Sequence, residues 1–216
     1  MFQKDPLLSL DPSPHSPHNI IPELIKKNAE VLDVGCNIGF LARILMEKKV
    51  ITDGIDINNE ALQKAKKYCR QVYKRDLYKN KLDIKKQTYD YIIFADVLEH
   101  LPRPDILLMD AHQYLKKNGH IIVSLPNIAR FEIRLNLFFG KFDYTKGGII
   151  SEDHLRFFTR KSTTTMLEQC GYTVEDIIPT GLGHQIAIFP ELTAFQFVYV
   201  CKSLIPLKKN IPTVSI

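Results

Sequence analysis

The sequence predicts an α/β fold, in which a mainly parallel sheet carries helices on both faces. Strand-like and helix-like patterns alternate regularly from Val31 to Leu125, as in right-handed βαβ crossovers. A glycine turn also follows the first strand, in the segment VLDVGCNIGF at residues 31–40. The chain has 216 residues, enough to bury a sizeable core, so we expect a single domain over residues 1–216.

Five strands are expected in this part of the chain, at residues 31–35, 51–55, 71–74, 91–95 and 120–125. Three helices with an apolar face lie between them. Asn58 is the expected N-cap of the second helix. The segment KKNG at 116–119 has the basic residues and the glycine typical of a helix C-terminus, so we expect it to end the third helix.

The pattern changes after Pro126, and residues 127–160 are expected to form a small inserted cap after the fifth strand. Thr159 or Ser162 can cap a later helix closed by Gly171, and two last strands are expected near 172–178 and 195–201. Residues 1–20 are predicted to be an extended arm and residues 205–216 a tail. Six aromatic residues in this segment are expected to form the core of the cap, and not to stack on a substrate. They are Phe131, Phe138, Phe139, Phe142, Phe157 and Phe158.

Composition excludes several classes of function. The net charge of +5 comes largely from residues 64–86, and no nucleic-acid signature accompanies these lysines and arginines, so we interpret them as a solvated face. The four cysteines form no CxxC pair, which favours a reducing, cytoplasmic location and no metal site. We expect no secretory signal, because the N-terminus has no apolar core flanked by basic residues, and no membrane insertion, because no run of 18 apolar residues occurs.

Acidic residues recur where the predicted strands end. Asp56, Asp76 and Asp96 follow the second, third and fourth strands at separations of 20 residues, and Asp33 lies inside the first strand. Ligands of open parallel sheets bind beyond the carboxyl ends of the strands. We therefore expect one ligand-binding edge that these carboxylates share.

The spacing indicates which ligand this edge binds. Asp56 lies 21 positions after Gly35, as expected for a carboxylate that accepts hydrogen bonds from ribose hydroxyls. NAD would require glycines where Asn37 and Phe40 stand, and no P-loop follows. S-adenosylmethionine has a ribose but no phosphate, and its ammonium and carboxylate suit Asp33 and a helix N-terminus near Gly39. Asparagine tolerates left-handed backbone angles, so the turn is expected to survive at Asn37.

The segments VLDVGCNIG, GIDIN, KRDL and YDYIIFADVLEHL together resemble the motifs of class I S-adenosylmethionine-dependent methyltransferases. This resemblance implies a Rossmann-like seven-stranded sheet whose final strand is FQFVYVCK. The segments SLPNIARFEIRLNLFFGKFDY and EDHLRFFTRKSTTTMLEQCGY are similar to a bacterial subgroup related to MetW and the ubiquinone O-methyltransferases. Members are often associated with polysaccharide biosynthesis, which implies a small-molecule or glycan acceptor.

The resemblance also implies which residues contact the donor. The methionine end would be lined by Asp33, Gly35, Cys36, Asn37 and Gly39. The ribose would contact Asp56 and Ile57, the adenine Asp76 and Leu77, and the methyl-bearing region Ala95 and Asp96. Cys36 is not expected to be a nucleophile, because no paired histidine motif accompanies it.

Two histidines are candidates for a general base, His100 after the fourth strand and His154 in the cap. Both could instead have structural roles. Candidates for binding the acceptor are Asn127, Arg130, Tyr144 and Arg156. For the arginines, ion pairs that anchor the loop, for example with Glu132 or Asp153, are an equal alternative.

The sequence therefore predicts a methyltransferase that uses S-adenosylmethionine to methylate a hydroxyl of a small molecule or saccharide precursor. A donor-binding partner protein without catalysis, as in the MetW group, is the second hypothesis, and an NAD-dependent oxidoreductase is the third. Assembly as a homodimer is compatible with the sequence, which leaves the oligomeric state, the acceptor and the choice of base open.

Overall fold

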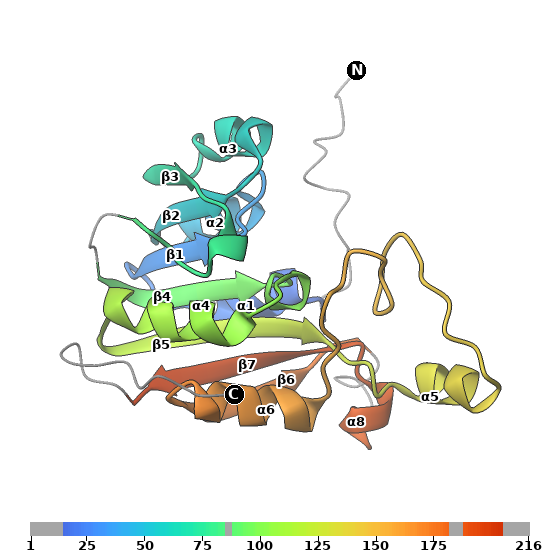
Figure 1. Cartoon of the computed structure of the whole chain (residues 1–216). Helices are drawn as coiled ribbons and strands as arrows, with labels where there is room; N and C mark the ends of the chain where they lie inside the picture. The colour runs from blue at the N-terminus through green and yellow to red at the C-terminus, as the bar shows by residue number, and fades with distance from the viewer. Residues whose placement is uncertain (1–14, 85–87, 182–187, 205–216) are drawn as a thin grey trace.

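The computed structural model describes residues 15–84, 88–181 and 188–204 and shows one seven-stranded sheet (Figure 1). The strand order is β3-β2-β1-β4-β5-β7-β6. The strands are β1 Glu30–Val34, β2 Ile51–Asp56, β3 Gln71–Lys74, β4 Tyr89–Ala95, β5 Leu115–Pro126, β6 Tyr172–Pro179 and β7 Gln196–Ser203. β1 to β5 pair in parallel, while β7 runs antiparallel to both β5 and β6. The predicted α/β fold, with an antiparallel pair at its end, is confirmed.

Helices cover both faces of this sheet, as predicted. The α-helices are α1 Pro17–Leu24, α2 Phe40–Met46, α3 Asn59–Ala65, α4 Pro104–Ala111, α5 Phe131–Phe138, α6 Arg160–Gln169 and α8 Pro190–Thr193. Short 3-10 helices are η2 Leu77–Lys79, η3 Leu98–His100 and η4 His112–Tyr114. None of the helices in the described residues has both the length and the apolar character needed to cross a bilayer.

Alternate residues of the central strands pack into two separate hydrophobic cores, one on each face of the sheet. Leu32 and Phe94 point toward α4 and α6, whereas Val31 and Ile93 pack with residues of α1 and α2. Successive side chains of a strand point to opposite faces, so a strand buried on both sides has to be apolar almost throughout. The lone carboxylate among these positions of β1, Asp33, is therefore an exception with a cause to be found at the site.

Local sequence signals define several helix starts. The Asn58 side chain accepts hydrogen bonds from the Glu60 and Ala61 backbone N–H groups at 2.9 and 3.2 Å, which confirms it as the N-cap of α3. Thr159 and Ser162 form a reciprocal capping box at the start of α6.

Two expectations about where helices begin and end are wrong. Residues 116–119 do not end a helix: α4 ends at Ala111, and Lys116–Gly119 belongs to β5. The basic residues and the glycine therefore continue a strand, and Lys116 forms ion pairs with Glu30 and Asp90 there. The arm is not extended up to residue 20, because α1 begins at Pro17, where proline suits the first helical turn. Residues 1–14 of the arm and the tail at 205–216 lie outside the described residues.

The segment from Asn127 to Phe158 leaves the sheet and returns to it, and it is the inserted segment that was expected. Its ends meet, since the Ile128 N–H donates to the Phe158 carbonyl at 2.9 Å. Figure 1 shows α5 standing apart from the layered body, beyond the carboxyl end of β5. Of its eight residues only Ile133 is buried.

The expected aromatic core of the cap is therefore wrong for most of its members. Phe158 is buried against the main core, but Phe131, Phe138 and Phe139 are 56%, 82% and 66% exposed. A single helix has no second layer to cover its apolar side, and a periodic aromatic pattern does not show whether such a layer exists. Smaller edge-on contacts join Phe142 to Tyr144 and Phe157.

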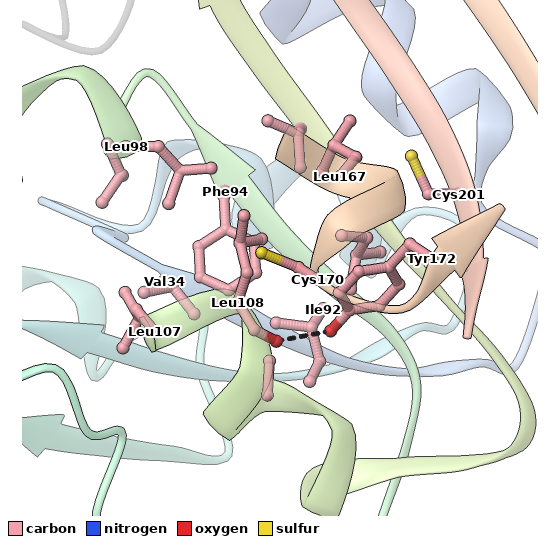
Figure 2. Packing of buried hydrophobic residues seen from close by; sticks show 14 of the residues in the cluster. Val34, Ile92, Phe94, Leu98, Leu107, Leu108, Leu167, Cys170, Tyr172 and Cys201 are labelled. Carbon is pink, nitrogen blue, oxygen red and sulfur yellow. Dashed lines mark hydrogen bonds between the residues drawn. The ribbon is translucent and has the colours of Figure 1, made fainter. Parts of the chain in front are cut away.

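Tyr172 joins the start of β6 to α4 and to the η4 turn that follows it. Its hydroxyl donates to the Leu108 carbonyl at 2.7 Å inside the core, as Figure 2 shows, and its ring stacks on His112 with the centroids 4.1 Å apart. The substitution Tyr172→Phe leaves a buried carbonyl without this donor, so we expect the free energy of unfolding to fall by about 1–3 kcal/mol.

Urea denaturation measures this loss. Tyr78→Phe is the matched control, because Tyr78 is 55% exposed, and its unfolding should be unchanged. Equal stability of the Tyr172→Phe variant and the wild type would contradict the assigned bond.

Candidate functional site

The turn after β1 adopts left-handed backbone angles at three positions. Gly35, Asn37 and Gly39 have φ values of +79°, +47° and +81°. A Cβ at Gly35 would lie 2.4 Å from a Val97 methyl carbon, and one at Gly39 would lie 3.0 Å from the Ala65 Cα. Both glycines are thus required sterically. Asn37 adopts the left-handed angle at a position where nucleotide-binding loops often carry a third glycine, which confirms the expectation that the turn survives there.

Asp56, the last residue of β2, fastens this turn. One carboxylate oxygen accepts the Asn37 N–H and the other the Asn58 N–H, each at 2.8 Å. The preceding carbonyl, of Ile55, accepts from Gly35 and Cys36 at 2.8 and 2.9 Å. Each carboxylate oxygen retains a lone pair, so Asp56 can hold the loop and still accept hydrogen bonds from two ligand hydroxyls.

Asp33 is the buried carboxylate of β1, 2% exposed. Burial, with a contribution from the negative charge of Asp56, raises its pKa to about 7. Its carboxylate makes no hydrogen bond within the part of the chain that the structure describes. A ligand ammonium would supply the charge that this site lacks. Burial also raises the pKa of the Cys36 thiol, so the structure agrees with its exclusion as a nucleophile.

The outer residues of this edge follow β2 and β3. Asp76 caps η2 by accepting the Tyr78 N–H at 3.0 Å, and Leu77 is half-buried against the main core. Ile57 is 58% exposed next to Asp56, where an apolar side chain is available to cover a flat ring.

Asp96 lies after Ala95 at the end of β4, with φ at +55°. Its Oδ1 accepts the Ser124 hydroxyl at 2.6 Å and the Gln196 side-chain amide at 2.7 Å. The sequence analysis missed both partners. They come from β5 and β7, and only the sheet topology brings them beside β4.

A cavity of about 630 Å³ opens from Asp96, at the same end of the sheet. Its walls come from the start of α1, the segment after β4, the cap and the start of β7. Lining residues include His15, His18, Asp96, Glu99, His100, Arg130, His154, Phe195 and Gln196. The volume is typical of small-molecule sites.

His100 and His154 meet in this cavity although they are far apart in the sequence. Their ring centroids are 4.9 Å apart. The cap is fastened here by the Glu99 carbonyl, which accepts the Leu155 and Arg156 N–H groups at 2.8 and 3.0 Å. The structure thus brings together the two histidines predicted as candidates for a base.

Glu99 is a residue of the site that sequence reasoning missed. It is 1% exposed, and neither carboxylate oxygen has a hydrogen-bond partner in the described chain. Burial, and next the charge of Asp96, raise its pKa well above the usual range. The sequence does contain a signal for this residue. Glu99 is an ionisable residue that directly follows the apolar pair Val97-Leu98 and comes three positions before Pro102.

Of the four predicted acceptor residues, Arg130 lines the cavity. Its guanidinium forms an ion pair with Glu132 at 2.9 Å. This is the ion pair that the sequence offered as the alternative to acceptor binding. The Asn127 amide is buried and donates to the carbonyls of residues 191 and 194. The Arg156 guanidinium donates to the Pro102 carbonyl, and Tyr144 is 57% exposed on the cap. Contact of these residues with an acceptor stays a prediction.

Two comparisons concern individual proteins. The chain is 30% identical over 103 residues to the ubiquinone biosynthesis O-methyltransferase of Yersinia pestis (strain Pestoides F) and 27% identical to that of Vibrio atlanticus (strain LGP32). These matches cover 45% of this chain and 43% and 44% of the relatives, so the chain spans less than half of their length.

Solved structures match over more of the chain. A SAM-dependent methyltransferase from Archaeoglobus fulgidus has a TM-score of 0.65 at 16% identity, covering 86% of this chain and 94% of that one. One from Aquifex aeolicus has a TM-score of 0.61 at 20% identity, covering 93% and 100%. At these identities the likeness shows the fold.

The decisive match is to a family model described as a methyltransferase domain, which covers residues 14–177. This chain belongs to the methyltransferase domain family. The fold is that of the S-adenosylmethionine-dependent members, and the residues around the β1 turn fit this donor. Asp33 suits the ammonium of the donor and Asp56 its ribose hydroxyls, while the two glycines leave the backbone bare beside it.

The substitution Asp33→Asn should separate stability from donor binding. The folded-state pKa of about 7 lies above the unfolded value of 3.8, so folded protein binds more protons between these values and its stability falls as the pH rises through them. At about pH 8 we expect the variant to melt at a higher temperature than the wild type, with the difference vanishing near about pH 4.

Calorimetry should show that the same variant binds S-adenosylmethionine much more weakly, because the partner of the ammonium is neutral. A variant that melts below the wild type at about pH 8, or that binds the donor equally well, would contradict the role of Asp33.

Proposed function

We propose that this methyltransferase transfers the methyl group of S-adenosylmethionine to a hydroxyl oxygen of a small molecule. The observation that carries the proposal is the continuity of the site: the donor-binding edge at β1 and β2 adjoins, through Asp96, a cavity that holds two histidines. The names of the curated relatives, which are O-methyltransferases, support oxygen as the acceptor atom.

The main contribution of this chain to methyl transfer is to position the donor and the acceptor. The donor supplies a methyl group already activated by a sulfonium. Asp33 binds the methionine end of the donor and Asp56 its ribose, and Ser124 and Gln196 hold the Asp96 carboxylate where the cavity begins. Holding two reactants in line can contribute about 7–11 kcal/mol.

The histidines provide a proton acceptor for the hydroxyl. Nδ1 of His100 lies 3.1 Å from the Asp153 carbonyl, and Nδ1 of His154 lies 3.0 Å from the Ile149 carbonyl. A carbonyl only accepts, so each Nδ1 carries the proton and each Nε2 keeps its lone pair. A base of this kind contributes about 10²–10⁴-fold to the rate.

The resemblance to the subgroup related to MetW and the ubiquinone O-methyltransferases supports an acceptor that is a small molecule or a saccharide precursor of polysaccharide biosynthesis. The reaction then takes place in the cytoplasm. Arg130 at the cavity wall supports an anionic or sugar acceptor, since guanidinium suits carboxylate and phosphate.

One observation favours the second candidate, a donor-binding partner protein without turnover. Phe131 and Phe138 of α5, with Phe139 directly after it, are exposed apolar side chains, as expected for a surface that docks on another protein or on a second copy in a homodimer. This role requires donor binding but no methyl transfer.

Calorimetry and methyl transfer together test the proposal. Wild-type protein should bind S-adenosylmethionine, and transfer of labelled methyl groups to a panel of phenolic, hydroxy-acid and sugar acceptors should yield a methyl ether. Asp56→Ala should abolish both, because it removes the ribose contacts and also releases the Asn37 turn. Glu168→Ala, on the exposed side of α6, is the control and should retain both.

Absence of donor binding by the wild type would overturn the proposal. Donor binding without transfer to any acceptor, together with a stable complex with another enzyme, would favour the partner protein.

A further inference from the structure

Three side chains at the floor of the cavity have the arrangement of metal ligands. One nitrogen from His100, one from His154 and one oxygen from Glu99 all lie within 4.8 Å of one another. Glu99 and His100 come from η3, and His154 comes from the cap, which the backbone of Glu99 holds in place. The cluster therefore forms only in the folded chain.

The Glu99 carboxylate lacks a partner for either oxygen, although it is 99% buried. Leaving such a group unpaired costs free energy, and in the described chain no arginine or lysine is paired with it. The nearest charges that affect it, those of Asp96 and Asp153, are negative. A cation is the type of ligand that this environment accommodates.

The two imidazoles are oriented as ligands are. Each Nδ1–H donates to a backbone carbonyl, of residue 153 or 149, and each Nε2 has a free lone pair. Metal-ligating histidines nearly always donate their other N–H to a carbonyl or carboxylate, which fixes the ring and its tautomer.

We propose that Glu99, His100 and His154 bind a divalent transition-metal ion, with its remaining coordination positions open to the cavity. Two imidazoles and one carboxylate suit Zn²⁺, Co²⁺, Fe²⁺ or Mn²⁺. Ligands about 2.0–2.2 Å from an ion lie roughly 3–3.5 Å apart. The three ligand atoms therefore have to move closer together on binding, and the two histidines that carry two of them are only partly buried. The expectation of no metal site is based on the absence of a CxxC pair, and this cluster contains no cysteine.

The metal site adds a role to the proposed methyl transfer, and the role that we give the ion rests on that proposed function. The open positions face the space where the acceptor binds, so the ion would orient the acceptor hydroxyl and lower its pKa. The histidines would then act on the hydroxyl through the ion, in place of the free bases described above, and the proton of the hydroxyl would leave to solvent water in the open cavity. The acceptor class narrows to molecules whose oxygen atom can coordinate a divalent cation.

Titration with Co²⁺, followed by visible absorption, tests the site. Metal-free full-length protein should take up one Co²⁺ per chain, with ligand-field bands of nitrogen and oxygen coordination and no sulfur charge-transfer band, since all four cysteines are buried. Zn²⁺ should displace the cobalt. His154→Gln should lose the bands, and so should Glu99→Gln.

His120→Gln is the matched control, because His120 also lies beside a carboxylate, Glu175 at 3.0 Å, but has no second histidine. It should keep the bands. His154 lies on the cap outside the core, so its variant is expected to fold, and its unchanged binding of S-adenosylmethionine by calorimetry verifies this.

Wild-type protein without cobalt bands, or His154→Gln with the same bands as the wild type, would overturn the metal site. Neither outcome affects donor binding, so failure of the metal site is distinct from failure of the proposed function.

Discussion

The site depends on one carboxylate, that of Asp56, which ties two loops to the end of β2. Its oxygens bind the N–H groups of Asn37 and Asn58, and its own carbonyl accepts the Arg75 N–H at 3.0 Å. The turn after β1, the start of α3 and the exit of β3 are thus fixed to a single residue. Because Asp56 binds the backbone N–H of residue 37 and asparagine tolerates the left-handed angle there, the turn keeps its shape although a glycine is missing.

The acceptor side is built differently, by contacts between distant segments. The Glu99 carbonyl fastens the cap, Gln196 and Ser124 reach Asp96 from two other strands, and the cap closes on itself at Asn127 and Phe158. The donor edge is thus a property of βαβ units, whereas the cavity is assembled from the start of α1, the segment after β4, the cap and the start of β7. The residues of the cavity can therefore vary while the donor edge stays intact, since one fold can carry different sites.

The same division explains what could be predicted. The carboxyl ends of the central strands, the Asn58 cap, a cap at Thr159 or Ser162 and the left-handed angle of Asn37 depend on neighbours in the sequence, and all were predicted. Lys116–Gly119 looked like a helix end because its ion pairs with Glu30 and Asp90 are tertiary contacts. The exposure of Phe138 and the isolation of the Glu99 carboxylate also depend on what packs above them, which periodicity does not encode. His100 and His154 were named separately, and only the fold shows that they meet.

The central claim is that one edge of the sheet holds the donor and directs it toward the histidine cavity. A crystal structure with bound S-adenosylhomocysteine tests it most directly. The account predicts both ribose hydroxyls within hydrogen-bond distance of Asp56, the ammonium beside Asp33 and the sulfur facing the space between Asp96 and His100. A ligand whose ribose lies in the cavity beside Arg130, with Asp56 bound only to its own loops, would contradict it.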